Sequence, residues 1–313
     1  MCAVKVLTNA SARDHAVEDA KVSLTLILPL RAKESISIDD FYSYWLNVHV
    51  TLPPRFPGIS SVWLHVVSFD RQVWPRLPGV DDRPESADEF HGVPEATFAS
   101  PHDLNLFQTY SNVQMEDGAN FLAEQIAYRS LAPNSVTVVD KLDTPAPDGH
   151  DGLLRHLVFL RKRGDVSIAD FREFVSETLI PAYAQAPQLL KLRRHLFEEV
   201  ELTLDHPGVA MFKPLERQYQ AAFEVVFADE AALLDFAGSA AWLDTAEQFA
   251  ATCQAVHAVR VDRCITTKLD GQITLAGVRG IAVADTIARL GADNQREPAV
   301  SELFLSSLGQ AAP

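Results

Sequence analysis

Residues 41–49 read Phe-Tyr-Ser-Tyr-Trp-Leu-Asn-Val-His, and this stretch decides the fold. Ser37 or Asp39, just before it, can cap the start of a helix, because a side-chain oxygen there accepts a hydrogen bond from a free backbone N–H. The apolar spacing predicts a helix over residues 38–52. Pro53-Pro54 cannot continue it.

One face of this predicted helix is apolar and also carries an imidazole. His49 lies four residues after Trp45, which places the two side chains on the same side of a helix. A large aromatic ring and a titratable group therefore point together toward whatever the helix packs on. The turn at Pro57-Gly58 leads into the next strand. The residues that recur at helical spacing are Phe41, Trp45, Val48 and Leu52.

Length, composition and charge indicate a globular protein of two domains. The chain has 313 residues, is 47% hydrophobic and carries a formal net charge of −15. Such an acidic chain does not suit nucleic acid or an anionic membrane as a partner. No apolar run is long enough to span a membrane, and the first residues lack the layout of a signal peptide. We therefore expect a cytoplasmic protein.

The three cysteines give no metal-binding spacing, and an odd number suits a reducing compartment. We expect Cys253 and Cys264 to be buried thiols without chemistry. The third is Cys2.

The order of predicted elements is βαββαβ, which is the ferredoxin-like unit. Helices are predicted over residues 38–52 and over residues 101–131, the second with a break near Asp117-Gly118. Residues 70–88 form a long loop rich in proline and acidic residues. The predicted strands cover residues 22–30, 62–67, 95–99 and 136–140.

The same pattern then restarts. Residues 167–171, Ser-Ile-Ala-Asp-Phe, repeat residues 37–41, Ser-Ile-Asp-Asp-Phe, at an offset of 130 that also carries His65 onto His195. The offset falls to 127 by the end of the unit, as expected for a diverged duplication with loop insertions. The second copy has Val175 and Leu179 in place of Trp45 and His49. We therefore expect the chemistry in the first copy.

The repeat divides the chain into three parts. Residues 1–145 are predicted to form the first ferredoxin-like unit with the candidate active site, and residues 151–270 a second, degenerate unit. The segment between them is rich in proline and glycine. Residues 271–313 form a C-terminal arm whose apolar cluster should pack on the body or on a second subunit, which would make a homodimer. That cluster is Leu303, Phe304, Leu305 and Leu308.

The pattern Phe-x-x-Tyr-Trp-x-x-x-His followed by Pro-Gly resembles the EthD-type branch of the dimeric α+β barrel superfamily. Residues 89–98 resemble that branch's third strand, with His91 where aspartate is usual. The resemblance implies an α+β fold in which two ferredoxin-like units pack sheet to sheet as an internal pseudo-dimer. It also implies lyase, cyclase, isomerase or cofactorless monooxygenase chemistry.

His49 is the first candidate for catalysis, as a general base that titrates near neutral pH. Its alternative is a partly buried histidine bonded to a carbonyl. Tyr44 or His65 would stabilise the oxyanion that develops during proton removal. The presence of His195 at the position equivalent to His65 favours a structural role for that pair.

The candidate substrate-binding residues come from the helix and the second and third strands. His91 and Glu95 could orient His49 or bind a substrate hydroxyl, or could be solvated edge residues. The aromatic side chains would line a pocket for a small ligand, or simply fill the core. They are Tyr44, Trp45, Trp63, Phe90 and Tyr110.

Nucleotide, flavin and metal signatures are absent from the sequence, including the glycine-rich phosphate loops and the paired histidines of zinc hydrolases. We therefore expect no cofactor and a small-molecule substrate that is apolar or aromatic. The expected enzyme is a lyase, cyclase or isomerase. The alternatives are a cofactorless monooxygenase and a non-catalytic protein that binds a small ligand or haem.

Overall fold

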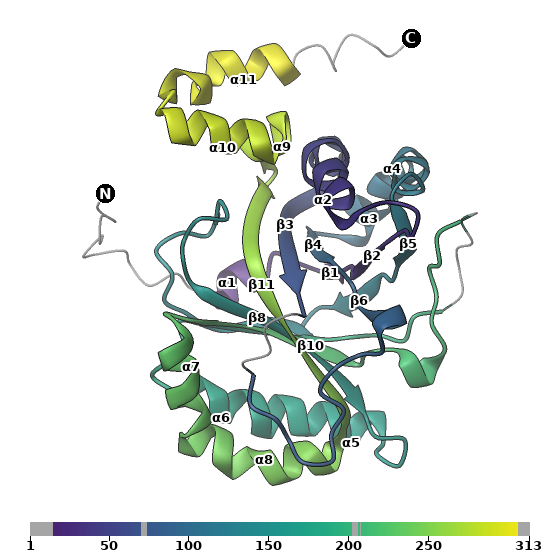
Figure 1. Ribbon diagram of the computed structural model, residues 1–313, viewed down its shortest axis with the longest axis vertical. Coiled ribbons are helices and arrows are strands. Elements are labelled where there is room, and N and C mark those ends of the chain that lie inside the picture. The colour runs from purple at the N-terminus through teal and green to yellow at the C-terminus, as the bar shows by residue number, and fades with distance from the viewer. Residues whose placement is uncertain (1–14, 70–73, 202–205, 207, 306–313) are drawn as a thin grey trace.

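In the computed structural model, which describes residues 15–69, 74–201, 206 and 208–305, twelve strands form one continuous sheet (Figure 1). The sheet belongs to two successive ferredoxin-like units and closes into a barrel, with helices on its outer face. The fold is therefore α+β, of the dimeric α+β barrel type, with both halves supplied by one chain.

The first unit begins after α1 (His15–Asp19). Bends in the chain divide its long strands into shorter ones, such as β1 (Leu24–Ile27) and β2 (Leu30–Ala32). The other elements of this unit are α2 (Ile38–Asn47), β3 (Ile59–Ser68), β4 (Gly92–Phe98), α3 (Pro101–Gln108), α4 (Ser111–Gly118), β5 (Leu122–Gln125), β6 (Tyr128–Leu131) and β7 (Ser135–Asp140).

The second unit repeats this order with fewer interruptions, and a helical arm follows it. The unit contains β8 (Leu154–Lys162), α5 (Ile168–Glu173), a π-helical segment (Phe174–Leu179), α6 (Ile180–Ala184), β9 (Lys191–Leu196), β10 (Ala221–Phe227), α7 (Glu230–Ala237), α8 (Ala240–Thr252) and β11 (Cys253–Leu269). The arm contains β12 (Gln272–Ile273), α9 (Leu275–Arg279), α10 (Ile281–Leu290) and α11 (Pro298–Leu305).

The two units are joined because the last strand of each unit also pairs with a strand of the other unit. Residues 253–261 of β11 pair with β8 of the same unit, and residues 260–268 pair with β3 of the first unit. In the same way β6 pairs with β1, whereas β7, which follows it, pairs with β9. This exchange closes the sheet at both seams.

Two sequence expectations are corrected here. The predicted helix over residues 101–131 ends at Gly118, and β5 and β6 occupy its last part, where burial alternates from Tyr128 to Leu131 as in a strand with one covered face. The predicted strand 136–140 exists as β7, but its partner is β9 of the second unit. Local periodicity gives no information about a partner that lies so far along the chain.

The helices that open the two units show the duplication directly. Ser37 and Ser167 cap them, accepting hydrogen bonds from the backbone N–H of Asp40 and Asp170. Phe41 and Phe171 are both fully buried. The first helix stops at Asn47, earlier than expected, and two 3₁₀ turns follow it.

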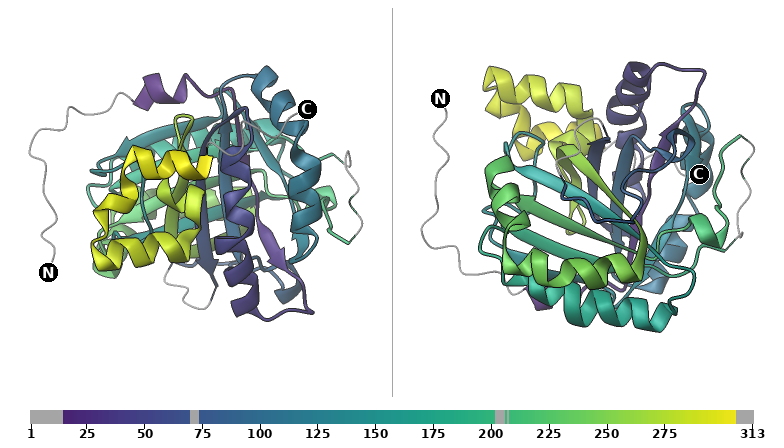
Figure 2. Two further views of the ribbon diagram at one scale, coloured as in Figure 1. Left: turned by 90° about the horizontal axis from the view of Figure 1, so that it is seen from above. Right: turned by 60° about the horizontal axis from the view of Figure 1, so that its bottom comes forward.

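The helices flank the barrel on opposite sides, and the two halves of the sheet enclose its interior between them (Figure 2). α2 to α4 cover the outer face of the first half, and α5 to α8 cover the second. The interior is apolar at one end, around Val67, Phe90 and Phe159. At the other end it carries buried charges, described below.

The C-terminal arm docks beside the end of α2. Arg55 donates to the carbonyl oxygens of Gly277 at 3.0 Å and Val278 at 2.8 Å, and Asn47 Oδ1 accepts from the Ala282 N–H. The centre of the Phe304 ring lies 4.0 Å from the Arg279 guanidinium carbon, so this side chain contacts the arm. The Leu303 side chain, in contrast, is 74% exposed. Leu308 lies outside the described residues, and the homodimer stays a prediction.

Among the helices of the described residues, none combines the length and apolarity that crossing a membrane requires.

Candidate functional site

A cavity of about 480 Å³ lies between the outer face of the first half of the sheet and the helices that cover it. Trp45 and His49 form part of its wall. β1, β3 and β4 contribute their outward-facing side chains, such as Leu26, Leu64 and Ala96. The first unit therefore contains an apolar chamber with one imidazole in its wall.

His49 is held by a carboxylate on another helix. His49 Nδ1 lies 2.7 Å from Asp117 Oδ2, near the end of α4, and the Tyr44 hydroxyl donates to Asp117 Oδ1 at 2.6 Å. Asn120 in turn donates to the Tyr44 oxygen at 3.2 Å. The His49 side chain is 6% exposed, and the Asp117 side chain 18%. This row of polar groups fixes the imidazole at the cavity wall.

The charges in this row can be assigned. The hydrogen bond with His49 lowers the pKa of Asp117, and a second one from Tyr44 adds to it, so Asp117 is a carboxylate. The same carboxylate raises the pKa of Tyr44, which keeps the phenol neutral and donating. A carboxylate beside Nδ1 favours the tautomer with the proton there. The lone pair is then on Nε2, for which the described residues provide no hydrogen-bond partner.

His49 is not on the helix where the sequence placed it. α2 ends at Asn47, and His49 begins a 3₁₀ turn, His49–Thr51. Pro53 has no N–H to continue an α-helical hydrogen-bond pattern. As a result Val48, expected on the buried face, is 47% exposed, while His49 is buried against the edge of the Phe121 ring.

Gly92 makes room for Trp45. A Cβ atom at Gly92 would lie 2.3 Å from the Trp45 ring, well inside contact distance. The ring therefore packs directly against the backbone of β4 at Gly92, and its position depends on a residue with no side chain.

The second unit supplies part of the same cavity. Val200 and Met211, from the segment between β9 and β10, line it. Backbone hydrogen bonds tie this segment to β5: Gln125 N–H donates to Ala210 O, and Ala210 N–H donates to Ala123 O, both at 2.9 Å. On the helical side, Gln114 lies three residues before Asp117, and its Oε1 is buried without a partner among the described residues.

In the second unit the equivalent space is filled. Trp74, from the segment after β3, packs between the sheet and α8 of the second unit, 5.8 Å from the rings of His156 and Trp242. His156 corresponds in the repeat to Leu26, which lines the first cavity. The space next to Trp74 measures only about 10 Å³. The candidate site is therefore present in one of the two halves.

The structure separates the residues that the sequence grouped into one site. Trp63, His65 and Glu95 face the barrel interior, on the opposite side of the sheet from His49. Phe90 lies in the apolar end of the same interior. These four residues cannot share a ligand with His49, because β3 and β4 lie between them.

The remaining candidates lie at the edges of the site. His91 Nδ1 accepts a hydrogen bond from the Ala32 N–H at 3.2 Å, and its ring packs 5.6 Å from Phe41. Tyr110 is largely exposed and stacks on Phe56. Tyr44 bonds to Asp117 and does not line the cavity.

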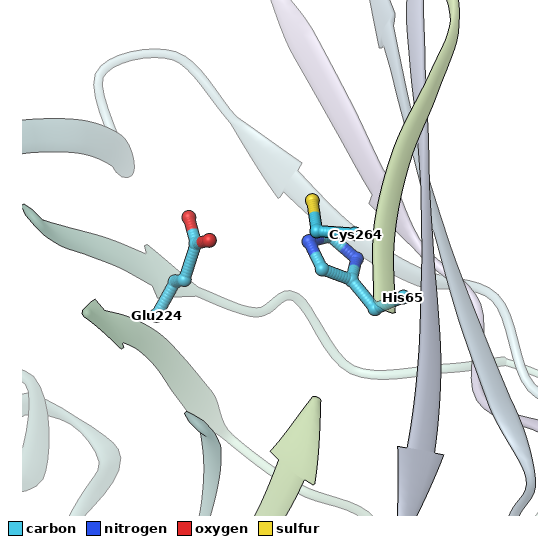
Figure 3. Close-up of side chains that lie close together, drawn as sticks. All are labelled: His65, Glu224 and Cys264. Atoms are coloured by element: carbon cyan, nitrogen blue, oxygen red, sulfur yellow. The ribbon is translucent and has the colours of Figure 1, made fainter. Parts of the chain in front are cut away.

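The barrel interior holds a network of buried charges. Glu95 lies 3.2 Å from Arg193, and Glu224 lies 3.1 Å from Arg155 and 2.5 Å from Lys191. Next to it, side-chain ligand atoms of His65, Cys264 and Glu224 lie within 4.8 Å of one another (Figure 3). These three residue types could hold a metal ion. Two cations already neutralise Glu224, however, and they oppose a metal there.

Sequence reasoning missed Asp117. No spacing rule connects two residues 68 positions apart. The only signal was the break in helical pattern near Asp117-Gly118, which is where α4 ends.

Comparison with known proteins gives neither a matching family model nor a curated relative. Among solved structures, a candidate monooxygenase from Lactobacillus acidophilus is 13% identical and covers 79% of this chain and 97% of its own, with a TM-score of 0.44. A candidate monooxygenase from Fusobacterium nucleatum is 8% identical over 81% of this chain and 96% of its own, with a TM-score of 0.48. An anthrone oxidase-like protein is 12% identical and covers 79% of this chain and 93% of its own, with a TM-score of 0.47. Similarities at this level say nothing about activity.

Proposed function

We propose that this protein is an enzyme without a cofactor, in which His49 removes a proton from an activated C–H or O–H group of a small apolar molecule. One observation carries the proposal. The Asp117–His49 pair, with its 2.7 Å hydrogen bond, stands in the wall of a cavity of about 480 Å³. An imidazole oriented by a carboxylate is a recurring general base.

The roles of the side chains follow from their hydrogen bonds. Nε2 of His49 accepts the proton, and Asp117 stabilises the imidazolium that results. Tyr44 is a positioning residue, because its hydroxyl is engaged by Asp117. Gln114 is the better candidate to stabilise the developing oxyanion: it lines the cavity and is one helical turn from Asp117, and its amide N–H groups can donate.

The lining defines the substrate class. Aliphatic and aromatic side chains such as Leu64, Phe98 and Phe107 dominate the walls. Charged side chains in the lining, Arg129, Glu198, Glu199 and Glu201, come from the segments around β6 and after β9 rather than from the helices beside His49. A neutral aromatic or polyketide-like molecule with one or two carbonyl or hydroxyl groups fits this distribution.

The fate of the carbanion decides the reaction type. Return of the proton to another carbon gives an isomerase, and expulsion of a leaving group gives a lyase, whereas attack on a second carbonyl gives a cyclase. Reaction of the same carbanion with dioxygen would give a cofactorless monooxygenase, the activity named for two of the solved structures above. We favour the first group, as the EthD-type resemblance allows. Product analysis with and without oxygen separates it from the monooxygenase.

The test uses a carbon acid as a probe. Purified protein is mixed with 2-tetralone in D₂O, and NMR follows loss of the acidic C–H signals. The control variant Ala96→Phe fills the cavity from β4 without changing His49, and it should abolish both probe binding, read by tryptophan fluorescence, and exchange. Exchange that Ala96→Phe leaves unchanged would contradict the proposal. Binding without exchange would favour the small-ligand-binding alternative, and the visible absorbance spectrum would reveal haem.

A further inference from the structure

We propose that Cys264 and His65 form a second reactive site, inside the barrel, where the sulfur of Cys264 adds to an electron-poor alkene such as an enone or a quinone. This site is independent of the proposed function, because it lies on the opposite face of the sheet from His49. Cys264 was expected to be an inert buried thiol, and its surroundings argue otherwise.

The first argument is the orientation of His65. Its Nδ1 lies 2.9 Å from the carbonyl oxygen of Val93, so Nδ1 carries a proton and donates it. Nε2 is then the nitrogen left to act on Cys264, which β11 places directly opposite His65 in the strand pairing. Figure 3 shows the imidazole beside the sulfur, with the Glu224 carboxyl group across from both.

The second argument is the charge around the thiol. Burial lowers the pKa of His65, but Cys264, Glu224 and Glu95 together raise it to about 9, so His65 is suited to take up the proton that Cys264 gives up. The Arg155 guanidinium also interacts with Cys264. Reactive cysteines lie beside such cations. The charged groups around this cluster include His65 from β3, Glu95 from β4, Arg155 from β8, Lys191 and Arg193 from β9, Glu224 from β10 and Asp140 from β7.

The third argument is access. Cys264, His65 and Arg155 line a cavity of about 810 Å³ in the barrel interior. Its lining also includes the exposed residues Lys21 and Asp270, so it opens to the surface. Cys253 is also buried, but it does not line this cavity: it lies in the apolar core of the second unit, where burial raises its pKa.

A metal ion is the competing explanation for the cluster. The Glu224 carboxylate already pairs with Arg155 and Lys191, however, and the positive charges of these two side chains would repel a metal ion bound there. Proton transfer between the Cys264 thiol and the His65 imidazole adds no net charge to this cluster.

The reaction balances without a co-reactant. Cys264 first gives its thiol proton to His65 Nε2. The sulfur then forms a bond to the β-carbon of the alkene, and the π electrons move onto the carbonyl oxygen as an enolate. The proton on His65 Nε2 then passes to the enolate, which gives the saturated thioether and a neutral imidazole. No oxidant or reductant is consumed.

The test is labelling with N-ethylmaleimide at pH 6.0 in a Cys2→Ser background, followed by peptide mass spectrometry. We expect one adduct, at Cys264, formed about tenfold or more faster than with N-acetylcysteine, and none at Cys253. His65→Gln should remove the rate advantage, and His65→Asn serves as a second variant if the first does not fold. His49→Ala should leave labelling unchanged, which separates this site from the proposed function.

Four outcomes would overturn the proposal. Cys264 could be labelled only after denaturation, or at the rate of the free thiol, or at the same rate in folded His65 variants. Stoichiometric Zn²⁺ binding that blocks labelling and is reversed by a chelator would assign the cluster to a metal instead.

Discussion

Asp117 Oδ2 lies 2.7 Å from His49 Nδ1, although the two residues are 68 positions apart and belong to different helical segments. α4 and the turn after α2 meet here at the wall of the apolar cavity. The relationship turns an ordinary buried histidine into an oriented one, with one ring nitrogen bonded and the other unpaired among the described residues.

Asp117→Asn should lower the rate constant for probe exchange by about 10²-fold and change probe affinity little. The amide keeps the shape but no longer stabilises the imidazolium. Tyr44→Phe should cost less, because it removes only the group that holds Asp117. The exposed neighbour Glu116→Gln is the matched control. Equal losses in Asp117→Asn and Glu116→Gln would point to general electrostatics rather than the pair.

Gly92→Ala should displace Trp45, because the new methyl group would lie 2.3 Å from the ring. We expect a loss of ~1–3 kcal/mol in the free energy of unfolding, typical of overpacking, together with weaker probe binding. Urea titration measures the free energy of unfolding, and tryptophan fluorescence measures probe binding. Gly164→Ala, where a Cβ meets nothing within 4 Å, should change neither.

Trp74→Ala should destabilise the second unit although the residue belongs to the segment after β3. It empties the space between the sheet and α8, and burial of this kind is typically worth ~3–5 kcal/mol. Thermal unfolding measures the loss, and the exposed Leu234→Ala provides the comparison. A loss below ~1 kcal/mol would mean that Trp74 does not fill that core.

His156→Leu should reduce the sensitivity of stability to acid. Burial, with a smaller contribution from the charge of Arg260, lowers the pKa of His156 to about 4. Its folded pKa is below the unfolded value near 6.5, so its contribution is complete above that pH and is lost as the pH falls toward 4. One such group contributes at most ~1.4 kcal/mol per pH unit. Urea unfolding at pH 7.5 and pH 5.0 should therefore differ less in the variant. His195 and His257, whose pKa values are lowered to about 3 and about 4, keep part of the slope.

Local signals in the sequence predicted much of the fold. The repeated serine caps, Phe41 and Phe171 gave two ferredoxin-like units, and the motif around Trp45 gave the wall of the cavity. In each case the information lies within one turn or one strand, or in the comparison of one copy with the other.

Features that depend on distant partners were not predictable in this way. The sequence grouped Trp63 and His65 with His49 in one candidate site, but it could not say that their side of the sheet lines the barrel interior. The pairing of β7 with β9, the insertion of Trp74 into the other unit and the hydrogen bond from His49 to Asp117 all join segments whose spacing carries no pattern.

The most direct test of the central claim is the rate of 2-tetralone C–H exchange by His49→Gln, measured beside the wild type and His195→Gln. Loss of the general base should lower the rate constant by ~10²–10⁴-fold, with unchanged probe affinity and melting temperature. His195→Gln should retain the rate once differences in stability are matched. Wild-type exchange by a folded, probe-binding His49→Gln variant would contradict the account.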